Sequence, residues 1–382
     1  MLPPGPKAPS AFQTIEWIVR PTHFLRQAQA KYGEPFTIRT AWSDAPMVLT
    51  SDPEEIKRAY AAPPDVLQGG DAADFLEPFV GRNSLLVLHG DEHLKQRRLV
   101  LPPFHGEALR RWSDTISTLA HAHLDTWPTG TPFRALPRMQ ELTLEIIQRV
   151  IFGSQDAELK HALRSALDLT QSTPNLIAMS LVQRDFGPYG RFLKAVERID
   201  ELVYARIDQP SETESILDLL KQSGATREEL RDQLVTLLAA GHETTATALA
   251  WALERLARHP ADLTADPQPF IDEVLRTRPV LSITARKTLQ PYTLAGHTLP
   301  EGVYVAPCIY LANRRGKPIP FGGGTRRCVG AAFATLELRE VLRAVSGRFR
   351  LRPPRAQGER MRRRSITLAP ARGAEIIADP LA

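Results

Sequence analysis

Hydrophobic residues along most of the chain recur with the 3.6-residue period of amphipathic helices. This spacing buries one face of a segment and leaves the other in water. It predicts helices over residues 21–32, 52–61, 108–124, 139–152 and 199–206. The expected fold class is therefore mainly α.

The longest helical pattern runs from Thr226 to His259 and stops before Pro260, which cannot continue a helix. Thr226 and Glu229 have the spacing of a capping box, in which each side chain bonds the backbone of the other residue. At 1.5 Å per residue, the helix is expected to be about 50 Å long.

Alternating patterns rich in β-branched and aromatic residues predict a few short strands. They fall at residues 35–39, 47–50, 292–298, 303–309 and, as a terminal pair, 365–378. Gly296, Pro300 and Gly302 predict a hairpin-like turn region for the two late segments. With no internal repeat and no clear linker, residues 1–382 are expected to form a single domain with small sheets beside a helical body.

The composition supports a globular chain with a sizeable core, since 43% of the 382 residues are apolar. The first ten residues lack the apolar segment of a secretory signal, and no later stretch approaches the ~20 apolar residues of a membrane span. We therefore expect a cytoplasmic protein with no integral membrane segment. The two cysteines, Cys308 and Cys328, exclude a disulfide framework and a Cys/His zinc spacing.

The formal charge of +5 is unevenly distributed, because ten arginines fall between Arg339 and Arg364. Such a run is either a surface for nucleic acid or an acidic protein, or simply a solvated C-terminal surface. The charge pattern alone leaves both interpretations open.

The densest local signal is the segment Phe321-Gly-Gly-Gly-Thr-Arg-Arg-Cys-Val-Gly330, which leads into a helical stretch over residues 331–345. Glycines permit close backbone approach, and a thiolate just before a helix N-terminus is stabilised by the helix dipole and amide hydrogen bonds. Cys328 is thus a candidate metal ligand. A buried structural cysteine in a tight turn is the alternative, whereas a phosphate cradle would need the Lys-Ser/Thr of a P-loop, which is missing.

Phe321, Gly324, Arg326, Cys328 and Gly330 match the FxxGxRxCxG haem loop, and the chain here resembles the cytochrome P450 superfamily, in particular its bacterial soluble members. The resemblance implies the P450 fold, with haem b between the long distal helix and the helix after the cysteine. It makes the Cys328 thiolate the axial iron ligand, which in this family favours O–O cleavage. It also implies that Arg326 pairs with a haem propionate and that Phe321 packs beside the sulfur.

Inside the long helix, Glu243 and Thr244 place an acid and a hydroxyl in an otherwise apolar run. Without the cysteine loop, a kinked helix with a back-bonding threonine would be a sufficient explanation. Together with that loop, the segment Ala240 to Thr245 resembles the oxygen-activation motif of the family. The resemblance implies that Ala240 and Gly241 leave room above the haem, and that Glu243 and Thr244 relay protons to dioxygen.

Glu273 and Arg276 set opposite charges three positions apart on one helical face. By themselves they would form an exposed ion pair worth a few tenths of a kcal/mol, roughly. Their place between the acid–threonine motif and the cysteine resembles the ExxR motif of the family. The resemblance implies a buried pair that braces the haem loop.

His93 and Arg97 lie on one face of a predicted helix, and Arg286 follows the Glu273–Arg276 segment. Isolated cations of this kind usually lie on the surface. The family resemblance implies instead that these three residues and Arg326 bind the two haem propionates through charge-assisted hydrogen bonds.

The sequence departs from the family pattern before the cysteine loop, where Phe321 follows Arg315 almost at once and a longer segment carrying the third member of the ExxR network is expected. Shorter gaps fall near residues 207–210 and 261–270. Either the protein is naturally shortened, or the sequence joins pieces of a longer chain across omitted residues. We favour the second explanation, which predicts a measured mass well above 42.5 kDa.

The resemblance implies a monooxygenase that inserts one oxygen atom from O2 into an apolar small molecule. Family position places the pocket at residues 66–88, at residues 176–181, at Leu237 with Ala240, and at residues 280–284, which include Val280, Ile283 and Thr284. Aliphatic residues in these stretches favour a terpenoid, steroid or fatty-acid-like substrate, with a compact terpenoid-sized molecule preferred.

The chain has no reductase domain, so electrons are expected from a separate acidic ferredoxin or flavodoxin with its NAD(P)H reductase. Lys95, Arg98 and the arginines from Arg339 onward are candidate docking cations, and for this reason we do not expect a nucleic-acid partner. A monomer is expected. The competing functions are a peroxygenase driven by H2O2 and a haem sensor or ligand-binding protein without turnover.

Overall fold

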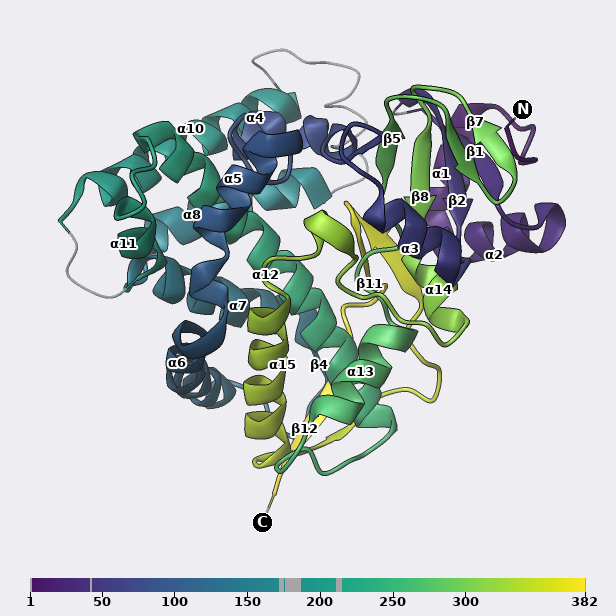
Figure 1. Cartoon of the computed structure of the whole chain (residues 1–382). Coiled ribbons are helices and arrows are strands. Elements are labelled where there is room, and N and C mark those ends of the chain that lie inside the picture. The colour runs from purple at the N-terminus through teal and green to yellow at the C-terminus, as the bar shows by residue number, and fades with distance from the viewer. Residues whose placement is uncertain (1, 42, 172–174, 176–186, 211–214, 382) are drawn as a thin grey trace.

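The computed structural model describes residues 2–41, 43–171, 175, 187–210 and 215–381. Most helices gather on one side of the molecule, and a mixed sheet with the N-terminal helices lies on the other (Figure 1). The helices are α1 Ser10–Val19, α2 Pro21–Tyr32, α3 Pro53–Ala61, α4 Glu77–Val80, α5 Gly90–Val100, α6 Gly106–Leu124, α7 Ala135–Phe152, α8 Ala157–Gln171, α10 Gly187–Asp208, α11 Ile216–Lys221, α12 Arg227–Arg258, α13 Gln268–Thr277, α14 Ile309–Arg314 and α15 Ala331–Ser346. The strands are β1 Phe36–Thr40, β2 Ser43–Thr50, β3 Leu67–Gln68, β4 Phe133–Arg134, β5 Arg286–Thr288, β6 Tyr292–Leu294, β7 His297–Leu299, β8 Tyr304–Pro307, β9 Phe349–Arg352, β10 Met361–Arg364, β11 Thr367–Pro370 and β12 Glu375–Pro380.

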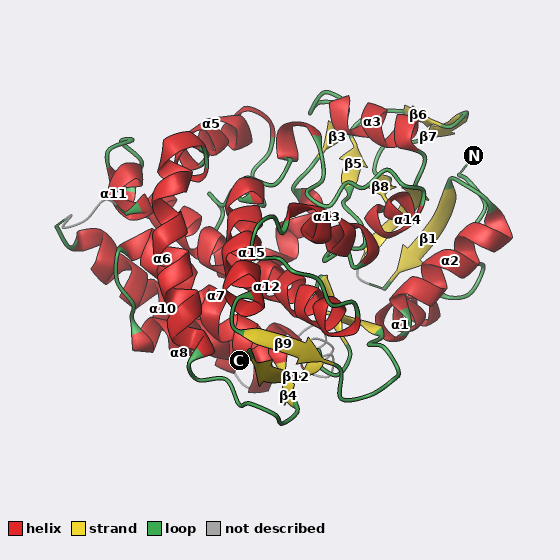
Figure 2. Ribbon diagram, turned by 90° about the horizontal axis from the view of Figure 1, so that it is seen from below, coloured by secondary structure: helices red, strands yellow, loops and turns green. Residues whose placement is uncertain are grey.

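The predicted long helix is confirmed as α12, which crosses the middle of the helical side (Figure 2). Its capping box forms as expected, since the Thr226 hydroxyl accepts a hydrogen bond from the Glu229 amide at 3.2 Å and the Glu229 carboxylate accepts one from the Thr226 amide at 2.8 Å. The helix packs against α7, α10 and α15. Its middle is buried on most sides because it carries small and aliphatic residues around nearly the whole helix.

The main sheet has five strands in the order β1-β2-β8-β5-β3. Strand β8 pairs in parallel with β2 and antiparallel with β5, so it is an interior strand, consistent with the complete burial of Val305 and Ala306. The expected pairing of the two late segments is therefore wrong. Instead, residues 292–299 form their own hairpin, β6–β7, which turns at Ala295 and Gly296, both with positive φ.

The C-terminal segment does not form one strand pair either. Strands β10 and β11 form a hairpin, whereas β12 lies between β9 and β4 (Figure 2). The turn residue Ser365, at φ 53°, separates β10 from β11, whereas residues 371–374, with positive φ at Gly373 and Ala374, separate β11 from β12 and divide the predicted segment. Within the described ranges, none of the helices combines the length and the apolar character needed to cross a lipid bilayer.

Candidate active site

The cysteine loop lies directly against α3. A Cβ atom on Gly323 would come within 2.4 Å of the Tyr60 ring, and one on Gly324 within 2.1 Å of the Tyr60 carbonyl oxygen. Gly324 also has a φ of +67°, which disfavours any other residue. The loop closes on itself through a 3.0 Å hydrogen bond from the Cys328 amide to the Phe321 carbonyl. The glycine-rich sequence is thus explained by close packing on Tyr60, a residue that the sequence pattern did not single out.

The Cys328 side chain is solvent-accessible at the entrance to α15, whose N-cap is Gly330. Protein atoms still surround the sulfur closely, and burial raises the pKa of the thiol. The Gly330 amide and the charges of Arg97 and Arg327 oppose this shift. Cys308 differs, because complete burial raises the pKa of its thiol to about 12. Of the two cysteines, only Cys328 has an accessible sulfur beside positive charge.

The four residues predicted to bind the propionates, His93, Arg97, Arg286 and Arg326, come together from three separate segments. His93, Arg286 and Arg326 line one small cavity. The pKa of His93 is lowered to about 3, first by burial and then by the positive charges of Arg326, Arg97 and Arg286. The electrostatic contributions that lower the pKa of His93 therefore all come from arginines and from His89. Such a concentration of positive charge favours a polyanionic ligand.

One face of α12 is accessible along a helix that is otherwise buried. Leu237, Ala240, Gly241 and Thr244 form this face, and their spacing places them on the same side of the helix. The Thr244 hydroxyl donates a 2.6 Å hydrogen bond to the Ala240 carbonyl. A Cβ atom on Gly241 would lie 3.2 Å from Ile147 Cδ1, so glycine at this position also lets α7 approach closely.

Glu243 points to a different side of α12 from Thr244, since neighbouring residues project about 100° apart around a helix. Its buried carboxylate accepts a 2.7 Å hydrogen bond from Gln140 on α7 and lies 3.8 Å from Arg364 on β10. Gln140 and Arg364 were not predicted as site residues, because their positions in the sequence carry no signal of contact with α12. The acid and the hydroxyl are adjacent in sequence but have separate partners.

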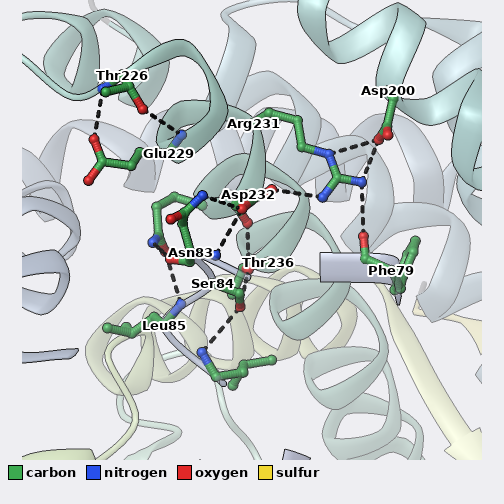
Figure 3. A network of polar contacts seen from close by, with 12 residues as sticks. Phe79, Asn83, Ser84, Leu85, Asp200, Thr226, Glu229, Arg231, Asp232 and Thr236 are labelled. Atoms are coloured by element: carbon green, nitrogen blue, oxygen red, sulfur yellow. Dashed lines mark hydrogen bonds and ion pairs between the residues drawn. The ribbon is translucent and has the colours of Figure 1, made fainter. Parts of the chain in front are cut away.

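The first turns of α12 hold the loop before α5 through a buried polar network (Figure 3). Asp232 accepts hydrogen bonds from the backbone amide and the side-chain amide of Asn83, both at 2.9 Å, and from Arg231, also at 2.9 Å. Arg231 further donates to Asp200 at 2.8 Å and to the Phe79 carbonyl at 3.1 Å. The sequence pattern missed this network, because its partners lie far apart along the chain.

The same loop reaches the cysteine loop. Ser84 bonds the Thr236 hydroxyl at 2.6 Å and thereby ties the loop to α12. Two residues further on, the Leu86 carbonyl accepts a hydrogen bond from Arg326, and the Leu88 carbonyl accepts a second one. The distal helix and the cysteine loop are therefore connected through residues 83–88.

The predicted buried brace of Glu273 and Arg276 is wrong in this structure. The two side chains pair at 2.7 Å, but they are 58% and 36% exposed on the outer side of α13. The chain passes from α14 to the cysteine loop in a short step, and no segment of the described residues between them covers the pair. The buried link is made by Asn313, which donates to the Leu275 carbonyl and accepts from the Ile319 amide, each at 3.1 Å.

The predicted substrate contacts lie in different surroundings. Leu237 and Val280 are partly buried against the main core, whereas Ile283 packs against the core formed with the N-terminal helices. Thr284 shares a 2.9 Å hydrogen bond with the Tyr60 hydroxyl and faces Gly322 of the cysteine loop. The predicted pocket segment 176–181 lies outside the described residues.

These groups fit an iron porphyrin with two propionates. Cys328 supplies an accessible sulfur, the cation cluster matches two carboxylates, and the accessible face of α12 is apolar except for one hydroxyl. The cluster of positive groups is the strongest of these observations, because positive charge concentrated around a cavity favours the binding of a polyanion.

The chain belongs to the cytochrome P450 family, whose model matches residues 3–262 and 313–377. The matched ranges contain Cys328 and the acid–threonine motif, but not Glu273 and Arg276. As a member of this family, the chain is a haem b monooxygenase that uses dioxygen and a redox partner.

Two mycobacterial relatives align over nearly the whole chain. Cytochrome P450 135B1 of Mycobacterium bovis is 35% identical over 436 positions, covering 98% of this chain and 91% of the relative. Cytochrome P450 138 of the same organism is 33% identical over 427 positions, covering 98% and 96%. Both alignments are longer than the 382 residues of this chain, so each relative has internal residues without a counterpart here.

Two solved structures show the same fold. The retinoic acid-bound cyanobacterial CYP120A1 superposes with a TM-score of 0.84 at 19% identity, covering all of both chains. CYP175A1 from Thermus thermophilus superposes with a TM-score of 0.79 at 25% identity, covering 94% of this chain and 95% of the other. The predicted fold class is confirmed.

Proposed function

We propose that Cys328 is the axial ligand of haem b and that the enzyme inserts one oxygen atom from O2 into an apolar small molecule. The observation that carries this proposal is the group formed by His93 and the cations Arg97, Arg286 and Arg326 beside an accessible thiol. These cations would hold the two propionates, and Phe321 and Gly330 would complete the loop around the sulfur. Bound haem supplies the iron at which dioxygen is activated.

Thr244 and Glu243 have distinct parts in proton handling. The Thr244 hydrogen bond to the Ala240 carbonyl uses the hydroxyl proton, so the Oγ1 lone pairs face the accessible side and can accept a hydrogen bond. Glu243 holds its carboxylate on the other side, between Gln140 and Arg364. A proton released at Glu243 would therefore reach Thr244 through water rather than directly.

The accessible face of α12 also argues for an apolar substrate. Leu237 and Ala240 border the Thr244 hydroxyl, and Val280, Ile283 and Thr284 approach from the segment before β5. Aliphatic walls with one or two hydroxyls position an apolar molecule by shape more than by hydrogen bonding. The structural neighbour CYP120A1 was solved with retinoic acid bound. A terpenoid, steroid or fatty-acid-like substrate fits these walls.

The electron donor is proposed to be an acidic ferredoxin or flavodoxin that docks near the cysteine. Arg98 on α5 and Arg327 in the cysteine loop are exposed. The C-terminal arginines contribute less than the sequence predicted, because at least five of the ten form ion pairs with other described residues. These are Arg343, Arg348, Arg352, Arg355 and Arg364, paired with Glu340, Asp125, Asp379, Glu375 and Glu243.

Two measurements test the proposal. In the first, Cys328→Ala is expected to remove the thiolate signature from the spectrum of the reduced carbon monoxide complex, while Cys308→Ala, the matched control, keeps it. A normal spectrum for Cys328→Ala would refute the ligand assignment.

The second measurement is the ratio of product to electrons consumed, with ferredoxin, reductase, NADPH and an apolar substrate that shifts the haem spectrum. Thr244→Ala is expected to lower this ratio about tenfold or more, within the range for lost acid–base groups, and Thr244→Ser to restore most of it. An unchanged ratio would exclude the proton role of Thr244. Turnover with H2O2 but not with O2 would instead identify a peroxygenase, and no turnover with either would identify a haem sensor.

A further inference from the structure

The N-terminal helix α1 buries two polar residues and a tryptophan, and it turns three large apolar residues toward solvent. Gln13, Thr14 and Trp17 are buried, whereas Phe12, Ile15 and Val19 are 65%, 57% and 63% exposed. At 100° per residue the two sets lie on opposite sides of the helix. The usual arrangement of a surface helix is the reverse.

Specific hydrogen bonds fix this orientation. The Gln13 side-chain amide donates to the carbonyls of Pro6 and Ala8, at 3.2 and 2.7 Å, and its oxygen accepts from the Arg39 amide at 3.0 Å. The Thr14 hydroxyl accepts from the Ala41 amide at 2.8 Å. Rotating the helix to bury its apolar face would break all four bonds, so the exposed ridge of Phe12, Ile15 and Val19 is built into the fold.

The charges near this ridge are mostly positive. Lys7 precedes α1, Arg20 follows it, and Arg39 lies beside it on β1. Strand β10, which packs on α1, adds the exposed Arg362. Among the described residues none of these four side chains forms an ion pair, and α1 itself has one acid, Glu16.

We propose that the α1 ridge binds the surface of an anionic lipid bilayer, with Phe12, Ile15 and Val19 entering the acyl boundary and the cations contacting lipid headgroups. An apolar ridge flanked by lysine and arginine has this preference. A second copy of the chain fits less well, because pairing two α1 surfaces would bring like charges together. The docking of an electron donor concerns another region, since α5 and α15 lie away from α1 and β1 (Figure 1).

The test is cosedimentation of the full-length haem-loaded protein with vesicles of phosphatidylcholine, with and without phosphatidylglycerol. The wild type is expected to bind the anionic vesicles more tightly, and Phe12→Ser with Ile15→Ser to weaken binding about tenfold or more. Lys7→Gln with Arg20→Gln is expected to remove the preference for phosphatidylglycerol. The matched control is Leu219→Ser, an exposed leucine on α11 at the opposite end of the molecule, which is expected to bind like the wild type (Figure 1).

Three results would overturn the proposal. They are absence of wild-type binding, equal loss in Leu219→Ser, and loss of self-association rather than vesicle binding in the Phe12 and Ile15 variant, measured by light scattering. The substituted side chains face away from the core, so the circular dichroism and haem spectra of all variants are expected to match the wild type. The haem site does not take part, so failure here leaves the proposed monooxygenase reaction unaffected.

Discussion

Two ion pairs on neighbouring helices of this protein have opposite settings. Arg231 and Asp232 on α12 are each 7% exposed and share hydrogen bonds with Asn83, Asp200 and the Phe79 carbonyl (Figure 3). The side chains of Glu273 and Arg276 on α13 bond only each other among the described residues, and they are 58% and 36% exposed. Sequence resemblance favoured the second pair as a buried brace, whereas the structure exposes that pair and buries the first.

The difference shows what burial does to a charge. An exposed pair exchanges its bonds with water at little cost, so its loss changes little. A buried pair cannot do so, and removing one partner leaves the other charged and without solvent. We therefore expect the α12 network to stabilise residues 79–85 more than the α13 pair stabilises its own surroundings. The carbonyls of Leu86 and Leu88, which follow these residues, connect them to the cysteine loop by hydrogen bonds from Arg326.

The largest effect is expected for Asp232→Ala. The change leaves the buried Arg231 with one carboxylate fewer and removes both bonds to Asn83, so the free energy of unfolding should fall by about 3–5 kcal/mol. Urea unfolding of the haem-loaded protein, followed by circular dichroism, measures it, with Glu273→Ala as the matched control. Equal losses in the two variants would show that burial does not separate the two pairs.

The next effect concerns pH and the buried His242 on α12. Burial lowers its pKa from 6.5 to about 3, so the folded protein keeps the ring neutral while the unfolded chain takes up a proton below pH 6.5. Stability should be full above pH 6.5 and fall by about 1.4 kcal/mol per pH unit below it. His242→Gln is expected to flatten this slope in urea unfolding at a series of pH values. An identical slope would mean that the ring is already charged in the fold.

A smaller effect is expected for Glu337 on α15, a buried acid whose Oε1 has no hydrogen-bond partner among the described residues. Burial raises its pKa well above the usual value, so its contribution to stability is present at low pH and lost as pH rises. Glu337→Gln should therefore be more stable than the wild type at pH 8, by about 1 kcal/mol, and gain nothing at pH 4. Destabilisation at pH 8 would instead indicate a stabilising partner for the carboxylate.

The smallest effect is expected for Glu273→Ala, which should change the free energy of unfolding by about 0.5 kcal/mol or less, and less still in high salt. Haem retention should be unchanged in gel filtration. Loss of haem from this variant would restore the brace predicted from sequence. It would also imply that residues missing before Phe321 cover α13 in a longer chain.

The cysteine motif and the capping box could be predicted from sequence because both are local. The spacing of Thr226 and Glu229 sets a helix start wherever the helix lies, and the cysteine motif is a continuous run of ten residues, although its glycines also pack on the distant Tyr60. The partners of Glu243 could not be predicted in this way. Gln140 lies 103 residues before Glu243, and Arg364 lies in the C-terminal hairpin. The sequence around either residue gives no sign of a contact with Glu243.

By itself, the sequence determined the mainly α class and the long helix, and it singled out Cys328 as the candidate ligand, because helical period, caps and a contiguous motif act over a few residues. The tertiary structure decided which charges are buried. It left the pair of Glu273 and Arg276 exposed to solvent and hydrogen-bonded Asp232 to Asn83 in the interior. It also placed His93 and Arg286 at the same cavity and exposed the apolar residues of α1. The physical reason is that the free energy of a charged or apolar group depends on what covers it, and the covering residues come from distant parts of the chain.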